Sequence, residues 1–444
     1  MNVLFVLVDA FRADRASGLD RRCKTPVLDE LRRRSTYFAN AFAPASMTTC
    51  CTASILTGTY PFVHGIRSLA DARLRTDLPT LAERFREGGY RTWAEVTGQI
   101  APMTGLDRGF DEYTHREYSD TLDTPWGETL IRRLAADTPS PWFGFLHLWE
   151  LHNPRRVTPE YDQAEFGLSL YDRAVSSLDA QLGRLLARLP EDTALVLTGD
   201  HGEYVSDSRA GTVVGRLKEP LKQLKRHVPG ARKLRRFMPL LLEGADRMRG
   251  GGDEVTLNWL GHGYHVYDYL VRVPLLLHSP GLFPRGAEHQ ELVSHVDVFP
   301  TLVSSFGLPQ GDRTSLSGRD LTPLLRSAQD DLDGFHDRAV YVEASGGRTT
   351  PNPDQWLTGV RTPRYKYVRG LFNEELPEEL YDLASDPAEQ TNLVDGQPEL
   401  AAELRGRLRA LTEASSEEPE IDTSYTPEQQ AELERRLTDL GYLE

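Results

Sequence analysis

Two acidic residues stand directly after apolar segments that have the composition of buried β-strands. Asp9 follows the segment NVLFVLV, and Asp200 follows TALVLTG and precedes His201. A carboxylate and an imidazole are reasonable ligands for a divalent cation. The Asp-His pair alone is weak evidence, because an aspartate that caps a helix before a solvent-exposed histidine explains it equally well. The repeated position of an acid at the end of an apolar segment favours a cation site.

A second segment whose side chains could take part in a reaction is PASMTTCCTASILTGTYP, from Pro44 to Pro61. It concentrates hydroxyl and thiol side chains and ends on LTG before an aromatic residue and a proline. Segments of this kind often hold a nucleophile at the junction between a strand and a helix. Coordination to a cation would stabilise the alkoxide of a hydroxyl near neutral pH. The alternative is a hydroxyl that only caps a helix.

An alternation of strands and helices must position these residues. The strand candidates are NVLFVLVD, PWFGFLHLW, TALVLTGD, RVPLLLHS and AVYVEAS, and the helix candidates are TPVLDELRRRS, LPTLAERFREGG and YDRAVSSLDAQLGRLLARL. In the last of these, Val175, Leu178, Leu182 and Leu185 follow helical spacing. We therefore expect an α/β fold whose large mixed, mostly parallel sheet is flanked by helices. Ligands of such sheets collect at the carboxyl ends of the strands.

The pattern changes twice along the chain, which predicts three regions. Residues 1–330 would form the catalytic domain, with a basic insertion at about 207–253. Residues 331–444 would form a smaller α+β domain, in which GVRTPRYKYVRG alternates like one exposed antiparallel strand and TPEQQAELERRLTDLGYLE forms a terminal helix. Two interpretations of the insertion stay open. It is either a solvated helix over the rim of the site or a docking surface for an anionic polymer, lipid head group or membrane.

The overall composition limits the classes of partner and compartment. The net charge of -15, with 39% hydrophobic and 26% charged residues, argues against general nucleic-acid binding. Three cysteines, Cys23, Cys50 and Cys51, do not make a disulfide framework. The N-terminus lacks the features of a signal peptide, and no apolar run approaches the roughly 20 residues that span a bilayer. We therefore expect a cytoplasmic protein, and the sequence does not indicate its oligomeric state.

Several motifs, taken together, carry a resemblance to a known family. In chain order they are VLVDAFRAD, TPVLDEL, ASMTTCCTASILTGTYPFVHGIRS, HLWELHNP, TGDHGE, GHGYHVYDYLVRVPLLL, HVDVFPTL and LYDLASDPAEQTNL. Their order and content resemble the sulfatase family of the alkaline phosphatase superfamily, from residue 1 to about 395. The resemblance implies an alkaline-phosphatase-like fold and an ester hydrolase.

The same resemblance selects one residue of the hydroxyl-rich segment as the nucleophile. In the family this residue lies ten positions before the glycine of the LTG motif, which is Gly58 here, so the position falls on Thr48. Sulfatases that form formylglycine carry a Cys or Ser in a Cys-x-Pro-x-Arg pattern. Residues 48–52 read Thr-Thr-Cys-Cys-Thr and lack the proline and arginine, so no formylglycine is expected. An unconverted threonine resembles the phosphodiesterase branch of the superfamily.

The resemblance also implies a divalent cation and a set of ligands for it. The expected ligands are Asp9, Thr48, Asp200 and His201. Ala10 stands where sulfatases usually have a second aspartate, and His201 where they commonly have asparagine. This exchange favours manganese or zinc, with magnesium and calcium still open.

Further residues are expected on the substrate side of the site. The resemblance places His152 and His262 near the leaving group, as catalytic residues. His295 and Asp297, within HVDVFPTL, are expected to be structural. The residues expected to bind the substrate are Arg67, Thr97, Gln99 and His147, and the neutral pair Thr97 and Gln99 replaces a lysine and a histidine of classical sulfatases.

The sequence predicts a metal-dependent hydrolase that cleaves a sulfate or phosphate ester by in-line attack of metal-bound Thr48. A phosphodiester, phosphonate or phosphomonoester is chemically preferred, because a threonine sulfate lacks the elimination route of an aldehyde hydrate. The substrate would be a small, glycan-linked or lipid-linked anionic ester. Three alternatives remain: an arylsulfatase-type sulfuric ester hydrolase, a transferase of phosphorylated head groups, and a catalytically silent binding protein.

Overall fold

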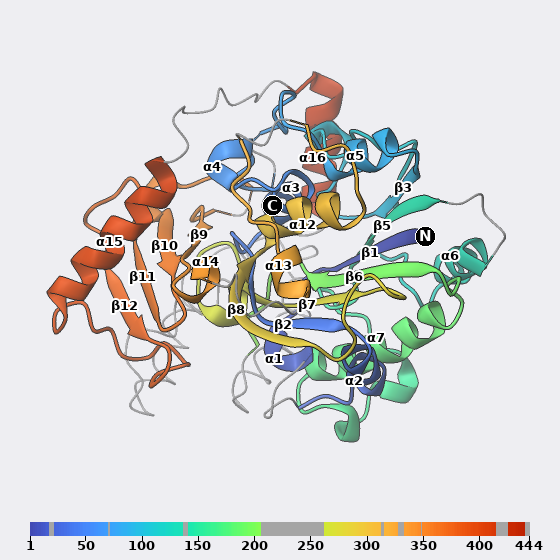
Figure 1. Cartoon of the computed structure of the whole chain (residues 1–444), viewed down its shortest axis with the longest axis horizontal. Coiled ribbons are helices and arrows are strands. Elements are labelled where there is room, and N and C mark those ends of the chain that lie inside the picture. The colour runs from blue at the N-terminus through green and yellow to red at the C-terminus, as the bar shows by residue number, and fades with distance from the viewer. Residues whose placement is uncertain are drawn as a thin grey trace, which may run out of the picture. The chain divides into compact units, whose positions relative to one another are not determined.

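An eight-stranded sheet forms the centre of the main domain, and the apolar N-terminal segment is one of its inner strands (Figure 1). Across the sheet the strands are β4 (Glu112–His115), β3 (Arg91–Val96), β5 (Trp142–Leu148), β1 (Asn2–Val8), β6 (Thr193–Gly199), β7 (Arg272–His278), β2 (Thr36–Phe42) and β8 (Glu288–Ser294). Only β7 runs antiparallel to its neighbours. The predicted large, mixed and mostly parallel sheet is confirmed.

The structure is a computed structural model that describes residues 1–16, 22–69, 72–135, 141–205, 262–311, 315–326, 333–347, 349–413 and 425–439. Residues Met1–Glu203 and Gly263–Glu444 form one compact unit, and Tyr204–His262 belong to a second. The basic insertion predicted at 207–253 lies outside the described residues. No helix in the described ranges is long and apolar enough to cross a membrane.

Helices cover the two faces of the main sheet. Figure 1 shows α3, α5 and α12 on one side and α1, α2 and α7 on the other. The helices of this domain are α1 (Ala13–Ala16), α2 (Pro26–Arg33), α3 (Thr48–Thr57), α4 (Pro61–His64), α5 (Leu81–Glu87), α6 (Pro125–Ala135), α7 (Leu170–Leu186), α11 (Asp268–Val271), α12 (Val298–Ser305), α13 (Thr322–Leu325) and α14 (Asp333–His336).

Strand β1 shows why a parallel sheet of this kind needs apolar residues at every position. Alternate side chains of a strand point to opposite faces, and helices cover both faces here. Val3, Phe5 and Leu7 join the core cluster that contains residues of α3, α5 and α12. All seven residues of β1 are buried, including Asn2, whose side chain accepts the N–H of Trp142 at 3.2 Å.

The three predicted helices of this domain are confirmed as α2, α5 and α7, and two of their starts have a clear physical cause. Ser169 caps α7 in a reciprocal pair of hydrogen bonds with Asp172, and Thr80 does the same for α5 with Glu83. Strands β2, β3, β4 and β8 were not predicted. β4 and β8 form the two edges of the sheet and are partly exposed, which explains their polar residues. β2 and β3 lie inside the sheet and are mostly buried, but polar residues such as Asn40 and Glu95 interrupt their apolar pattern.

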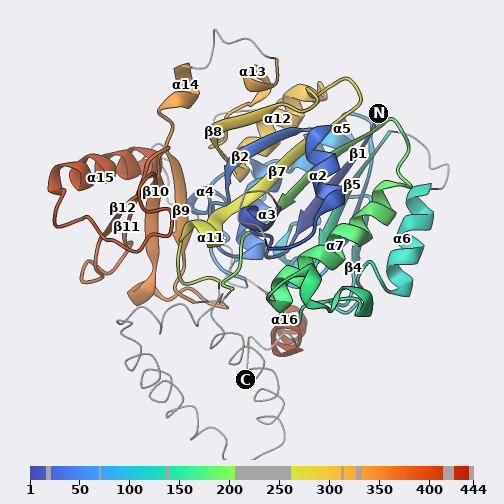
Figure 2. The same cartoon turned by 90° about the horizontal axis from the view of Figure 1, so that it is seen from below.

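A second sheet, of four antiparallel strands, follows in the C-terminal part, as expected for the smaller α+β region. Its order is β12 (Glu379–Asp382), β11 (Tyr365–Gly370), β10 (Leu357–Arg361) and β9 (Val340–Ala344), and helix α15 (Pro398–Glu413) packs on it (Figure 2). The segment GVRTPRYKYVRG was predicted to form one strand, and this prediction is wrong because the segment spans two strands, β10 and β11. Thr362 and Tyr365 close a turn between β10 and β11 through three hydrogen bonds.

The last helix, α16 (Pro427–Asp439), contacts the main domain. The hydroxyl of Tyr425 donates to the carbonyl of Ala72 at 3.0 Å. Further along the helix, Arg436 Nη1 lies 3.3 Å from Nε2 of His115, at the end of β4. The chain therefore returns to the main sheet after completing the small one.

Gly144 in the middle of β5 provides a test of the packing of this sheet. A Cβ atom there would lie 2.2 Å from a ring carbon of Trp93 on the neighbouring strand β3. We expect Gly144→Ala to reduce the free energy of unfolding by about 1–3 kcal/mol, because the indole must shift. Gly406→Ala is the control. Gly406 is exposed in α15 with open space at its Cβ position, so alanine should stabilise by about 0.5–1 kcal/mol. Denaturant unfolding measures both, and equal stability of Gly144→Ala and the parent chain would contradict this packing.

Candidate active site

The two predicted acidic residues lie next to each other at one edge of the main sheet. β1 and β6 are parallel neighbours with Val8 opposite Gly199, so the residues directly after them, Asp9 and Asp200, emerge at the same place. Both carboxylates are fully buried. The chain after Asp9 can pass this close to the end of β6 because residue 199 is a glycine. A Cβ atom there would lie 2.5 Å from the carbonyl oxygen of Phe11.

Main-chain groups hold one oxygen of Asp200 in place. Its Oδ1 atom accepts the N–H groups of Ala10 at 2.8 Å and of His201 at 2.6 Å. Among the described residues, Oδ2 of Asp200 and Oδ1 of Asp9 have no hydrogen-bond partner. Buried polar atoms are normally paired, so these two oxygens indicate a missing ligand.

The predicted nucleophile lies beside the carboxylate of Asp9 and the imidazole of His201. Thr48 is the first residue of α3 and is almost completely buried. Its Oγ1 atom lies 3.4 Å from Oδ2 of Asp9 and 3.3 Å from Nε2 of His201. The N-cap of α3 is Met47, so the Thr48 hydroxyl faces the acidic cluster instead of capping the helix.

His147, predicted as a substrate-binding residue, lies at the same cluster. It pairs with Leu7 in the register of β5 and β1, and its Nε2 atom is 3.4 Å from Oδ2 of Asp9. One ligand atom each from Asp9, His147 and Asp200 lie within 4.8 Å of one another. His201 Nε2 is 3.5 Å from Oδ2 of Asp200. The cluster therefore offers a cation one more imidazole than the predicted ligand set.

The electrostatics of the cluster fit a bound cation. Burial, reinforced by the charge of Asp200, raises the pKa of Asp9 well above its usual range. Burial alone would lower the pKa of His201, but the carboxylates of Asp200 and Asp9 raise it above its ordinary value. Burial lowers the pKa of His147 to about 3, which keeps this imidazole neutral, as a metal ligand must be. The two carboxylates therefore call for positive charge, and the neutral imidazole of His147 is available to a divalent cation bound there.

Thr97 and Gln99 lie just after β3 at the same edge and are buried. The Thr97 hydroxyl and both amide atoms of Gln99 lack a partner within the described ranges. Gly98 between them has φ +70°, and the ring of Trp149 would lie 2.6 Å from a Cβ atom there. The two side chains thus leave uncharged donors and acceptors for a ligand, consistent with their predicted role.

Arg67, also predicted to bind substrate, joins the main domain to the small sheet. Its guanidinium forms two hydrogen bonds with the carboxylate of Glu343 in β9, at 3.1 and 2.5 Å, and lies 4.4 Å from the ring centre of Trp356. Despite its burial, the charge of Glu343 raises the pKa of Arg67, so it stays cationic. Its contact with substrate remains a prediction.

The structure gives contacts for some of the remaining predicted histidines and leaves the position of His262 as a prediction. The ring of His152 lies 4.0 Å from that of Trp149, and its Nδ1 atom is 2.8 Å from the carbonyl of Asn153. His262 belongs to the segment Tyr204–His262, which is a separate unit, so its place at the site remains a prediction. His295 and Asp297 have structural contacts. His295 Nε2 lies 3.2 Å from the hydroxyl of Thr198, and Asp297 forms two bonds of 2.6 Å with Arg338.

Two contributors to the site were not predicted. The Ser46 hydroxyl accepts the N–H of Gly263 and donates to the carbonyl of His265, both at 3.0 Å, and so joins the GHGYH motif to the segment before Thr48. Tyr171 contacts the main chain after Asp9. Ser46 lies within the hydroxyl-rich segment but was not singled out there, and no motif marks Tyr171. The position of His147 at the cation cluster could have been inferred, because it lies near the end of a strand at the same sheet edge as Asp9.

Comparison with known proteins agrees with this geometry. The sulfatase family profile matches residues 1–308, and the profile described as the N-sulphoglucosamine sulphohydrolase C-terminal region matches residues 259–414. An ulvan-active sulfatase of Formosa agariphila is 24% identical over 92% of this chain and 80% of its own length. A Delta 4,5-hexuronate-2-O-sulfatase of Bacteroides thetaiotaomicron is 24% identical over 85% of this chain and 81% of its own length.

Solved structures show the same fold. The phosphonate monoester hydrolase of Agrobacterium radiobacter superimposes with a TM-score of 0.69, at 19% identity, over 93% of this chain and 96% of that one. Fold and site thus define a hydrolase of the alkaline phosphatase superfamily that acts on ester bonds. Within it, the chain belongs to the sulfatase family.

The cluster predicts a strong response to divalent cations. Adding Mn²⁺ to chelator-treated protein should stabilise it by about 2.7 kcal/mol at 100 times the dissociation constant, because only the folded chain brings the ligands together. Asp200→Asn should lose most of this stabilisation. Asp192→Asn is the control, because this exposed residue precedes β6, at the opposite end of the strand. Thermal unfolding with and without cation measures the effect. An equal cation response of Asp200→Asn and the parent would contradict the assignment.

Proposed function

We propose that this protein hydrolyses phosphorus esters, namely phosphodiesters, phosphonate esters or phosphomonoesters, with Thr48 as the nucleophile. The observation that carries the proposal is the position of the Thr48 hydroxyl. Its oxygen lies 3.4 Å from Oδ2 of Asp9 and 3.3 Å from Nε2 of His201, at the N-terminal end of a ten-residue helix. The N–H groups of this end favour negative charge on an attacking oxygen.

A divalent cation held by Asp9, Thr48, Asp200 and His201, with His147 as a further ligand, would supply positive charge that stabilises an alkoxide and the oxygens of the ester. The protein groups prepare the hydroxyl for this role. Nδ1 of His201 lies 2.7 Å from the carbonyl of Gly202, which fixes the ring with Nε2 toward Thr48. Oδ2 of Asp9 is close enough to accept the proton of the hydroxyl, and Nε2 of His201 is the ring nitrogen left for the cation.

The reaction then follows the in-line chemistry of phosphoryl transfer. The oxygen of Thr48 forms a bond to phosphorus while the bond from phosphorus to the leaving oxygen breaks. His152 is the proposed donor of a proton to that oxygen, and His262 is proposed to assist it. Water then attacks phosphorus and releases the Thr48 hydroxyl. The substrate would be small or linked to a glycan or lipid.

The neutral side chains near the cluster bear on the charge of the substrate. Thr97 and Gln99 offer a hydroxyl and an amide where an anion of two charges would call for cations. Among the phosphorus esters, a phosphodiester or a phosphonate monoester, with one negative charge, suits these partners better than a phosphomonoester. A sulfate ester also carries one charge, so these side chains do not separate it from them. Arg67 would add a cation to the substrate side only if its pair with Glu343 opened.

A sulfuric ester hydrolase, of the arylsulfatase type, is the second candidate, because the sequence relatives of this chain are sulfatases by name. Hydrolysis at sulfur would pass through a threonine sulfate, which releases its sulfate slowly without an aldehyde hydrate. A silent binding role is less favoured, since the Thr48 hydroxyl lies 3.4 Å from Oδ2 of Asp9. Head-group transfer at the same site is a further alternative. A cytoplasmic location, and peripheral contact through the 207–253 insertion, are further parts of the proposal.

A panel of p-nitrophenyl esters tests the proposal with Mn²⁺, Zn²⁺, Mg²⁺ and Ca²⁺ in turn. We expect bis-p-nitrophenyl phosphate or p-nitrophenyl phenylphosphonate to be cleaved with a higher kcat/KM than p-nitrophenyl sulfate. Peptide mass spectrometry should show Thr48, Cys50 and Cys51 unmodified. A preference for the sulfate ester by more than tenfold would instead support the arylsulfatase-type alternative. Absence of turnover with every ester and cation would support a silent protein.

Replacement of the nucleophile gives a second, independent test. Thr48→Ala should lower kcat/KM by about 10³-fold or more, whereas Thr48→Ser should keep measurable turnover. Thr49→Ala is the matched control. This neighbour is equally buried in α3, but its hydroxyl donates to the carbonyl of Leu69. Residual activity of Thr48→Ala close to that of Thr49→Ala would rule out a nucleophilic role.

A further inference from the structure

The main chain directly after Asp9 has an unusual conformation. Ala10 has φ +59°, in the left-handed region that residues with a Cβ atom rarely adopt. In this conformation the N–H of Ala10 donates to Oδ1 of Asp200 at 2.8 Å. One strained residue therefore sets the direction of the chain after Asp9 and also holds the carboxylate of Asp200. Such a conformation persists only where the surroundings fix it.

The carbonyl group of Ala10 is held by the phenol of Tyr171. Tyr171, in the first turn of α7, is 1% exposed, and its hydroxyl donates to the carbonyl of Ala10 at 2.6 Å. The same oxygen accepts the N–H of Arg12 at 3.0 Å. Burial raises the pKa of Tyr171, so the hydroxyl keeps its proton and remains a donor. The phenol thus joins the two main-chain groups on either side of Phe11.

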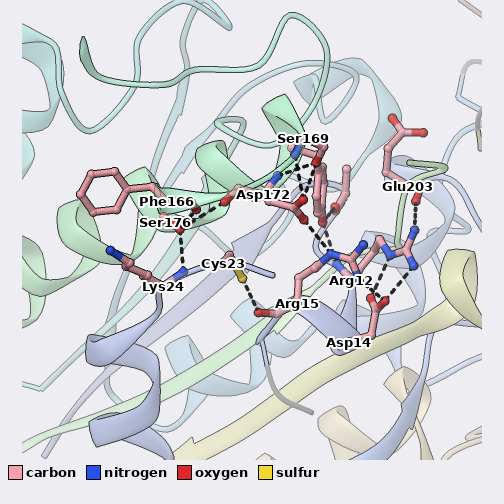
Figure 3. A network of polar contacts seen from close by, with 12 residues as sticks. Arg12, Asp14, Arg15, Cys23, Lys24, Phe166, Ser169, Asp172, Ser176 and Glu203 are labelled. Carbon is pink, nitrogen blue, oxygen red and sulfur yellow. Dashed lines mark hydrogen bonds and ion pairs between the residues drawn. The ribbon is translucent and has the colours of Figure 1, made fainter. Parts of the chain in front are cut away.

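The first turn of α7 is itself anchored to the same stretch of chain. Figure 3 shows Arg15 facing Asp172, the residue after Tyr171, and Arg12 lying between Asp14 and Glu203. Nε of Arg15 is 2.7 Å from Oδ1 of Asp172, and both side chains are buried. Nη1 of Arg12 donates to the carbonyl of Glu203, three residues after Asp200, at 3.1 Å. The phenol therefore has a fixed support.

Few alternative positions are open to this turn. A Cβ atom on Gly199 would lie 2.5 Å from the carbonyl oxygen of Phe11, so the chain after Asp9 passes directly against the end of β6. Rotation at Ala10 would break its bond to Asp200. It would also move the Asp9 carboxylate relative to the hydroxyl of Thr48, 3.4 Å away.

We infer that Tyr171 is a positioning residue for the cation site. Its hydroxyl holds Ala10 in the left-handed conformation, and Ala10 in turn fixes the relative placement of the Asp9 and Asp200 carboxylates. Residues that orient metal ligands typically affect cation affinity by 10–100-fold when they are replaced. This inference rests on the proposed cation-dependent function, but it concerns affinity and not turnover.

Calorimetric titration of chelator-treated full-length protein with Mn²⁺ tests the inference. Tyr171→Phe keeps the ring in the core and removes only the hydroxyl, so we expect a folded protein that binds Mn²⁺ at least about tenfold more weakly. Tyr425→Phe is the control, because its phenol also donates to a main-chain carbonyl, that of Ala72. This variant should bind Mn²⁺ as the parent does.

A second substitution separates positioning from packing. Glycine adopts positive φ without the Cβ penalty, so Ala10→Gly in the Tyr171→Phe background should restore part of the lost Mn²⁺ affinity. If Tyr171→Phe alone does not fold, the variant that carries both Ala10→Gly and Tyr171→Phe is compared with Ala10→Gly alone. The variant with both substitutions should then bind Mn²⁺ more weakly, by about tenfold or less. The inference is overturned if loss of the hydroxyl leaves Mn²⁺ affinity unchanged in a parent that binds it, or if glycine restores none of the loss. A parent chain that binds no Mn²⁺ would overturn the proposed cation site itself.

Discussion

The repulsion between two buried carboxylates governs the organisation of this protein. Asp9 and Asp200 end neighbouring parallel strands and are shielded from solvent, where charges are costly to leave unpaired. Nearby groups offset only part of this cost. Among the described residues, these groups include the imidazole of His201, its pKa raised by both carboxylates, the Thr48 hydroxyl that donates to Asp9, and two main-chain N–H groups on Asp200. A cation between them would complete the balance, and the same charge would act on the nearest hydroxyl, that of Thr48.

The fold produces this concentration of charge by ordinary means. Parallel strands bring the residues after their carboxyl ends to one edge of a sheet, and a helix that starts at the same edge adds its N-terminal dipole. Strand β5 adds an imidazole, and β3 leads to two uncharged side chains. Each contribution comes from a different segment of the chain. The site therefore depends on correct strand order more than on any one loop.

Much of this arrangement could be predicted from the sequence, because it depends on strand ends and motif order. Asp9, Thr48, Asp200 and His201 were predicted together, and the structure brings them together. Tyr171 could not be predicted, because a tyrosine at the start of an amphipathic helix looks like any core residue. The pairing of Arg67 with Glu343 joins residues 276 positions apart, and such long-range contacts leave no local pattern. The turn at Thr362 was missed although Pro363 follows it, a residue that cannot donate to a strand ladder.

The contact between Arg67 and Glu343 bears on how the two sheets depend on each other. The arginine lies just after α4 in the main domain, and the glutamate stands in β9, beside Ala45, three residues before Thr48. Each of these buried charges is neutralised by the other. A chain shortened before β9 would leave the cation of Arg67 without its partner, a defect that costs about 3–5 kcal/mol where the charge stays buried. The main domain therefore relies on the small sheet to keep this buried charge paired.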